Sequence, residues 1–292
     1  MNSPKRHHYV PDSYLAGFTE PGSAYAHIFS KQTSSFRRQR TNQVAVVGQY
    51  YRQDHAPDGV DKNVLEKHFG QEVEPKGMEA LRQLSIAPGS LGEEGMADFL
   101  QYLELQRIRV PRQLDQVRLS LEADLIARIL STPEISNTLN NRQLTIKESI
   151  RFEVLRNSVG LLIPYFSKMR WEIIEAAPGS SFITSDSPVS FQNPEILPPM
   201  EPGIAMYGTR VLFPLTKQRL LLLQYPQYLS KEKAATELLA EGQMVEDGSI
   251  EIVTGQVWSA RKVEIHNRVM FFLAQDIIVG ENEDVVRLAS GN

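Results

Sequence analysis

The stretch MADFLQYLELQRIRV, residues 96–110, is the most strongly patterned part of the chain. Its apolar side chains recur every three or four residues, which is the spacing of one face of an amphipathic helix. They are Met96, Phe99, Leu100, Leu103 and Val110. Pro111 follows at once, and because the first turn of a helix tolerates proline, it can open a second helix. The two segments predict a helical layer at the centre of the fold.

Strand-like runs lie on both sides of this helical centre. Residues 25–29 and 43–51 are rich in aromatic and β-branched side chains, and the polar segment 31–41 joins them, which predicts a hairpin with a long loop. Residues 61–86 have a helical period. Further along, the pattern predicts helices at 145–166, 231–240 and 250–263, and strands at 170–176, 181–186, 211–214, 219–224, 269–273 and 277–279.

These elements together predict an α+β protein. In it a central helical layer packs against antiparallel strands from the N- and C-terminal parts. We expect residues 1–292 to form a single domain with an N-terminal hairpin at 20–52, a helical region at 61–168 and a mixed strand and helix region at 169–292. A chain of this length can bury a substantial hydrophobic core.

The composition excludes several classes of protein. The chain of 292 residues has no cysteine, which rules out disulfide scaffolds, zinc ribbons, cysteine nucleophiles and iron–sulfur clusters. Its longest apolar runs, at 160–166 and 220–223, are far too short to cross a bilayer. The P-loop, GxGxxG, HExxH and GxSxG motifs are all missing. We therefore expect a cytoplasmic protein with no membrane partner.

The net charge of −4 is the sum of opposed blocks. Residues 1–52 carry seven basic and two acidic side chains, residues 53–105 are strongly acidic, and residues 107–118 are basic again. A basic patch attracts the phosphates of nucleotides or nucleic acids, whereas opposed patches can also neutralise one another in the fold. The candidate partners are therefore a nucleic acid, a nucleotide or a protein.

The segment KRHHYVP, residues 5–11, is the densest group of chemically useful side chains. Proline favours extended backbone before it, so His7 and His8 should point to opposite sides of the segment. We predict that one imidazole faces a site and acts as general acid or base, with Arg6 and Tyr9 next to the substrate. The alternative is an arm that docks with both rings held structurally.

The segment FITSDSPV, residues 182–189, predicts a strand that ends in polar residues, where catalytic groups of sheet proteins often lie. Asp186 can bind a metal, act as a base or orient an imidazole, and Thr184 and Ser185 are candidate substrate contacts. The alternative is an Asx-turn, in which Asp186 accepts backbone N–H bonds before a proline.

A third candidate group comprises Gln106, Arg107 and Arg112, on the central helices. An arginine at the margin of a core clamps a carboxylate or a phosphate. The structural partner would be an acid from residues 61–98, and the functional partner a substrate phosphate. The triplet Glu74-Pro75-Lys76 matches the spacing of metal nucleases, but those enzymes need it on a strand and here the pattern is helical.

The ordered motifs KRHHYVPDSYLAGFT, LQRIRVPRQ, FITSDSPV and LFPLT resemble those of a largely bacterial, uncharacterised family, domain of unknown function 4238. The resemblance spans nearly the whole chain and is specific because four motifs occur in order. Asp12-Ser13 stands where the family prefers Gln and an aromatic residue. The resemblance implies no particular reaction.

The leading functional hypothesis is a phosphodiester hydrolase, and more specifically a nuclease in bacterial defence or a toxin. His7 or His8 would transfer a proton, Asp186 would orient it or hold a divalent metal, and the three arginines Arg6, Arg107 and Arg112 would bind phosphate. The alternative is a non-catalytic nucleotide-, anion- or protein-binding sensor. A hydrogen bond between Asp186 and an imidazole in an open cleft would favour the enzyme, and a buried arm the sensor.

Overall fold

A computed structural model describes residues 6–48, 50–51, 59, 61–131, 155, 158–197, 200–225 and 250–291. Within these ranges no helix is both long enough and apolar enough to cross a membrane. The predicted helix at 231–240, and most of the one at 145–166, lie outside the described residues.

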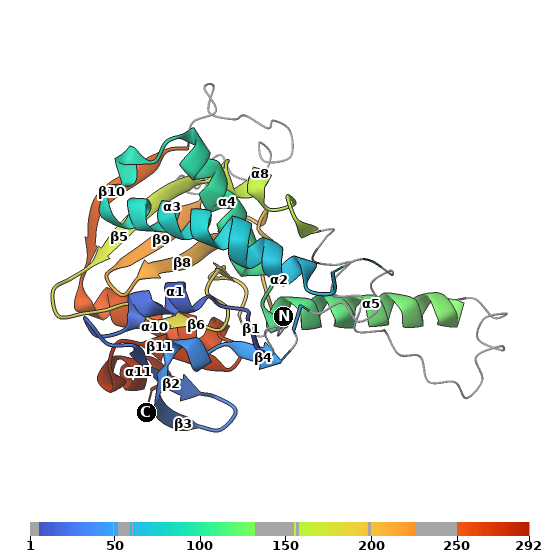
Figure 1. The fold of residues 1–292 in the computed structure, drawn as a ribbon, viewed down its shortest axis with the longest axis horizontal. Coiled ribbons are helices and arrows are strands. Elements are labelled where there is room, and N and C mark those ends of the chain that lie inside the picture. The colour runs from blue at the N-terminus through green and yellow to red at the C-terminus, as the bar shows by residue number, and fades with distance from the viewer. Residues whose placement is uncertain are drawn as a thin grey trace.

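A five-stranded sheet forms the middle of the molecule (Figure 1). Its strands, in spatial order, are β10 Ile252–Trp258, β5 Arg170–Ala176, β9 Arg219–Gln224, β8 Arg210–Thr216 and β7 Ser190–Gln192. β10 runs parallel to β5, and the other neighbours are antiparallel. β9 reads as a continuous apolar run because both faces of the sheet are covered: Leu221 and Leu223 pack in one core, Leu220 and Leu222 in another.

A four-stranded sheet joins the two ends of the chain. Its strands, in spatial order, are β3 Ser35–Arg40, β2 Tyr25–Ser30, β11 Ile277–Gly280 and β6 Thr184–Ser185, all antiparallel. A separate pair consists of β1 Arg6–His8 and β4 Val46–Gly48. The prediction of an α+β fold with strands from both parts of the chain is confirmed.

Helices cover the faces of the sheets. The first group comprises α1 Asp12–Leu15, η1 Ala16–Phe18, η2 Thr41–Gln43, α2 Val64–His68, the π-helical η3 Phe69–Val73, α3 Glu74–Ile86, η4 Pro88–Ser90 and α4 Glu93–Ile108. The second comprises α5 Pro111–Ser131, α8 Ile163–Phe166, α10 Ala260–Leu273 and α11 Glu283–Ser290. α3 and α4 lie over the large sheet, α10 and α11 beside the small one, and α5 projects from the body (Figure 1).

The predicted central helices are confirmed. α4 buries Phe99 and Leu103, and Phe99 lies against Trp171 of the sheet with ring centroids 5.4 Å apart. Pro111 opens α5, as the first-turn position allows. Glu74 and Pro75 begin α3, so the nuclease-like triplet is helical.

The hairpin prediction was wrong about the second strand. β2 pairs with β3, which lies inside the segment expected to be a loop, and the described part of the segment expected as a strand contains only the short β4. β3 is an exposed edge strand, so its arginine-rich sequence lacks the alternation that marks half-buried strands. The turn between β2 and β3 is short and puts Ser34 in the left-handed region at φ 49°.

Two predictions near the C-terminus were also wrong. Residues 250–263, expected to be helical, contain strand β10, which is rich in the strand-favouring residues Val, Thr and Trp. Residues 269–273, expected to be a strand, end helix α10 instead. The Ser259 side chain caps that helix, and Val263, Met270 and Leu273 recur on its buried face.

Candidate functional site

The N-terminal strand places its two histidines in different surroundings. Arg6 begins β1, and His7 is fully buried, with its ring stacked on Tyr51 and its Nδ1 accepting the backbone N–H of Tyr51 at 2.9 Å. His8 is partly exposed, and its Nε2 donates to the carbonyl oxygen of Asn42 at 3.1 Å. Both imidazoles therefore have structural partners, and His7 is the one that enters the interior.

A cluster of charged side chains adjoins His7. Nδ1 of His7 lies 4.0 Å from Oε2 of Glu66, on α2. Glu74, at the start of α3, accepts a hydrogen bond from Arg109 at 2.6 Å. Burial raises the pKa of Glu66 to about 7, the charge of Glu74 adds to this rise, and Arg109 opposes it. A carboxyl group that exchanges a proton near neutral pH therefore lies beside an imidazole.

Gln106 and Arg109 contain buried hydrogen-bonding groups without partners. Both side chains are fully buried, and among the described residues Nε and Nη2 of Arg109 and both amide atoms of Gln106 make no hydrogen bond. Because they are three residues apart, the two side chains lie near each other on the helix surface. Gln106 is a predicted site residue and Arg109 is not, although the helical spacing between them was a signal that could have identified Arg109.

Asp186 binds the backbone of a distant turn. Its Oδ1 accepts the N–H of Gln275 at 2.9 Å, and its Oδ2 accepts those of Asp276 and Ile277 at 2.7 and 2.9 Å. Burial raises the pKa of Asp186, and the three backbone bonds oppose the rise. Asp186 has no imidazole partner in the described part of the chain, so it does not orient His7 or His8 there. The alternative that Asp186 accepts backbone N–H bonds therefore fits. These N–H groups belong to the distant turn between α10 and β11 and not to the segment around Asp186 itself.

The neighbours of Asp186 are likewise used within the fold. The Thr184 hydroxyl lies 2.8 Å from that of Tyr14, which itself donates to the carbonyl oxygen of Pro214. Ser185 Oγ accepts the backbone N–H of Ser187 at 3.1 Å. These two hydroxyls, predicted as substrate contacts, stabilise the end of the strand.

Arg107 clamps a carboxylate that the sequence analysis did not anticipate. Its guanidinium forms an ion pair with Glu201, donates to the carbonyl oxygen of Val189 at 3.2 Å and stacks over the Phe191 ring at 4.1 Å. The expectation of a partner from residues 61–98 was wrong for Arg107. Arg109, for which no partner was predicted, is the arginine that pairs with an acid of that range, Glu74, because it points to a different side of α4 from Arg107.

Three residues of separate predicted motifs come together near the turn between α10 and β11. Burial raises the pKa of Tyr9 above its ordinary value, and the negative charge of Asp186 adds to the effect. Burial lowers the pKa of Lys31; Asp186 opposes this and Arg112 contributes to it. Tyr9, Arg112 and Asp186 thus lie in one electrostatic neighbourhood, to which the structure adds Lys31 and Asp276.

Lys31 and Arg112 meet at the C-terminus of α10. Nζ of Lys31 donates to the carbonyl oxygen of Ala274 at 2.6 Å, and Arg112 donates to that of Leu273. Cations are favoured there because the last carbonyls of a helix lack partners within the helix. Neither Lys31 nor Arg112 forms an ion pair with a carboxylate of the described residues. The result is a partly exposed pair of neighbouring positive charges.

A divalent metal remains a prediction. Across the described residues, no group of three or more His, Asp or Glu side chains could hold a metal ion. Asp186, the predicted ligand, already accepts three backbone hydrogen bonds.

The comparisons with known proteins identify the family. The chain is an α+β protein in which the charge of Asp186, in the TSD segment, acts on Tyr9 of the HHYVP segment. Residues 6–284 match the model described as Protein of unknown function (DUF4238), so the chain belongs to that family. No curated protein and no solved structure matches it.

Proposed function

We propose that the protein binds a phosphate-bearing ligand, such as a nucleotide, at the cation pair formed by Lys31 and Arg112. The observation that supports this is the placement of two like charges side by side, with no ion-pair partner among the described residues. Neighbouring cations repel each other, and an anion bound between them removes that repulsion. In this proposal the protein is a non-catalytic nucleotide or anion sensor.

The hydrogen-bonding capacity of the pair suits a phosphate. A guanidinium has five N–H donors in a planar fork that matches phosphate oxygens. One donor of Arg112 binds Leu273, which leaves most of the fork for a ligand.

The two carboxylates whose charge acts on Lys31 are engaged by other donors. Asp186 accepts three backbone N–H bonds, and Asp276 Oδ1 accepts the Ser30 hydroxyl at 2.9 Å and the Gln32 backbone N–H at 2.8 Å. Their charge is thus stabilised without consuming the donors of Lys31 or Arg112. The cations keep their capacity for an external anion.

Thermal-shift measurements with inorganic phosphate, pyrophosphate and ATP test the proposal. A ligand that binds the folded state stabilises it by about 2.7 kcal/mol at a hundred times its dissociation constant. We expect a rise in melting temperature that Lys31→Met and Arg112→Met each reduce and that the exposed control Lys62→Met retains. An unchanged ligand-induced shift in the double variant Lys31→Met/Arg112→Met would remove the proposal.

Phosphodiester hydrolysis is the second candidate, and the His7–Glu66 pair favours it. A carboxyl with a pKa near 7 beside an imidazole is suited to general acid–base catalysis. A nuclease acting in bacterial defence or as a toxin is the finer form of this candidate.

We propose the cytoplasm as the location, since a chain without cysteine has no disulfides to form in an oxidising compartment.

Cleavage assays separate the two candidates. The wild type is incubated with bis(p-nitrophenyl) phosphate, RNA and single-stranded DNA, with and without divalent cations. Hydrolysis that His7→Gln and Glu66→Gln abolish, in variants whose circular dichroism is unchanged, would support the enzyme. Phosphate binding without cleavage of any substrate would leave the sensor and reject the hydrolase.

A further inference from the structure

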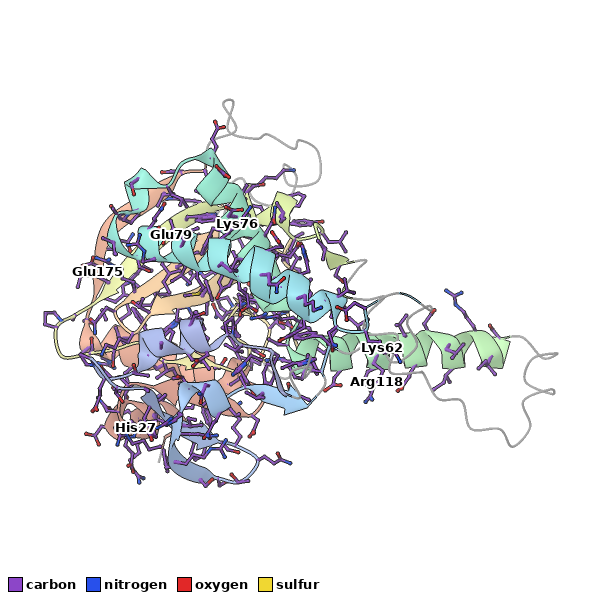
Figure 2. All side chains as sticks on the ribbon, in the orientation of Figure 1. His27, Lys62, Lys76, Glu79, Arg118 and Glu175 are labelled. Carbon is purple, nitrogen blue, oxygen red and sulfur yellow. The ribbon has the colours of Figure 1, made fainter. Side chains whose placement is uncertain are left out.

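One face of the β2–β3 hairpin carries a row of cations and aromatic rings. Cross-strand pairs place Tyr25 opposite Arg40 and His27 opposite Arg38, and residues two apart on a strand share a face. The hairpin lies at the bottom of Figure 1, and Figure 2 labels His27 on it. Arg37 immediately precedes Arg38 on the strand and therefore points to the opposite face. We call Tyr25, His27, Arg38 and Arg40 the hairpin face.

The cations of this region lie over aromatic rings. The Arg38 and Arg40 guanidinium groups lie 4.9 and 5.4 Å from the centre of the Tyr25 ring, and Arg40 Nε also donates to the Tyr25 hydroxyl at 3.0 Å. The row continues with Arg287 over the Phe36 ring and Lys31 over the Phe271 ring. A guanidinium stacked on a ring presents its second flat side outward, where another planar group can stack.

The positive charge of the hairpin face is not neutralised within the described protein. Arg38 and Arg40 are exposed, and neither forms an ion pair with a described carboxylate, whereas Arg287 pairs with Glu283. Charge on an edge strand also protects it from pairing with other chains. Protection against strand pairing needs only exposed charge. It does not explain why the Arg38 and Arg40 guanidinium groups both lie over the Tyr25 ring.

We propose that the hairpin face binds single-stranded nucleic acid. Arg38 and Arg40 are two residues apart on one strand, about 7 Å, which is comparable to the separation of adjacent phosphates in an extended nucleotide chain. Bases stack on the exposed planes of the guanidinium groups, which the Tyr25 ring holds in place, while the cations contact phosphates. An acidic protein would use the charge but not the stacking surface. This inference goes beyond the proposed anion site, whose residues Lys31 and Arg112 stay intact in the variants below.

Fluorescence anisotropy with a labelled single-stranded oligothymidine, titrated at several salt concentrations, tests the proposal. We expect Arg38→Ala/Arg40→Ala to weaken binding roughly tenfold at low salt and to flatten the log–log salt slope by about 1.4, since two phosphate contacts are lost. Tyr25→Leu should weaken binding through lost stacking. The control is Arg37→Ala, which removes one positive charge from the opposite face of the same strand, against two in the double variant, and should keep wild-type affinity.

Each other result has a defined meaning. An equal loss in Arg37→Ala would show that binding follows net charge alone and would overturn the proposal. Tighter binding of duplex than of single strand, no binding at low salt, or affinity indifferent to Tyr25→Leu would overturn it too. The phosphate-induced thermal shift should be unchanged in Arg38→Ala/Arg40→Ala, so failure of one site can be told from failure of the other.

Discussion

Nη1 of Arg109 lies 2.6 Å from Oε1 of Glu74, and the Arg109 side chain is fully buried. The pair joins the start of α3 to the end of α4. Because a buried guanidinium has lost its hydration, the carboxylate is the group that makes its charge tolerable. The stability of the fold therefore depends on this contact, which also lies beside His7 and Glu66.

Replacing Glu74 by Gln should destabilise the protein strongly. The substitution leaves an uncompensated charge in the interior, and breaking a buried pair in this way costs about 3–5 kcal/mol. Urea denaturation measures the change in the free energy of unfolding. The control is Glu79→Gln on the same helix, whose carboxylate pairs with Arg82 at the surface and whose loss should matter far less. Equal effects of the two variants would contradict a buried, charge-dependent role for Glu74.

Asp186→Asn should reduce stability because the side chain would have only one oxygen for three backbone donors. An amide NH₂ would also face a backbone N–H, and a buried donor left without a partner costs about 1–3 kcal/mol. Urea denaturation is the measurement, and Asp186→Ala should lose at least as much. Full stability in Asp186→Asn together with loss of a reaction would instead make Asp186 a catalytic residue.

The helical centre could be predicted from the sequence because its information is local. Residues 96–110 repeat with a helical period, and Pro111 marks the boundary between α4 and α5. Strand β3 could not be predicted, because an exposed edge strand has no buried face that would give its sequence a hydrophobic period. Its position is determined by its pairing with β2. Local pattern reveals an element only where that element buries one face.

Only part of the candidate site could be predicted, because its contacts, like the pairing of β3, depend on the tertiary fold. The motifs identified Tyr9, Arg112 and Asp186, which lie in one electrostatic neighbourhood. The partners of Asp186 are backbone N–H groups 89 to 91 residues away, and no sequence pattern encodes such contacts. Lys31 was hidden in a segment read as a loop. A residue's chemical type is visible in a sequence, but its partner depends on the tertiary fold.

Gly77→Ala should be strongly destabilising, and Gly70→Ala should not. A Cβ added at Gly77 would collide with the Tyr102 side chain, which packs directly against α3, whereas nothing lies within 4 Å of a Cβ at Gly70. Overpacking of this kind costs about 1–3 kcal/mol, while an unhindered Gly→Ala change in a helical segment stabilises by about 0.4–1 kcal/mol. Thermal and urea denaturation of both variants measure the difference. Similar stability of the two would mean that Tyr102 does not pack against Gly77.

His266 should make the protein lose stability as the pH falls below neutral. The ring is buried between Phe182 and Trp258, its Nε2 has no hydrogen-bond partner among the described residues, and burial lowers its pKa from 6.5 to about 3. Between those values the unfolded chain binds a proton that the folded chain does not. The free energy of unfolding therefore decreases as the pH falls from 6.5 toward 3, by about 1.4 kcal/mol per pH unit from this group.

Urea denaturation of the wild type and of His266→Leu between pH 7 and 5 isolates this effect as the difference between their slopes, because Glu66, whose pKa burial raises to about 7, adds the opposite slope to both. His266→Leu, which fills a similar volume and cannot be protonated, should lose the His266 contribution of about 1.4 kcal/mol per pH unit whatever its absolute stability, because the slope depends only on proton uptake. The exposed control His68→Gln should keep the wild-type slope. Equal slopes in the wild type and His266→Leu would show that the buried imidazole does not resist protonation, and would assign the acid sensitivity to other groups.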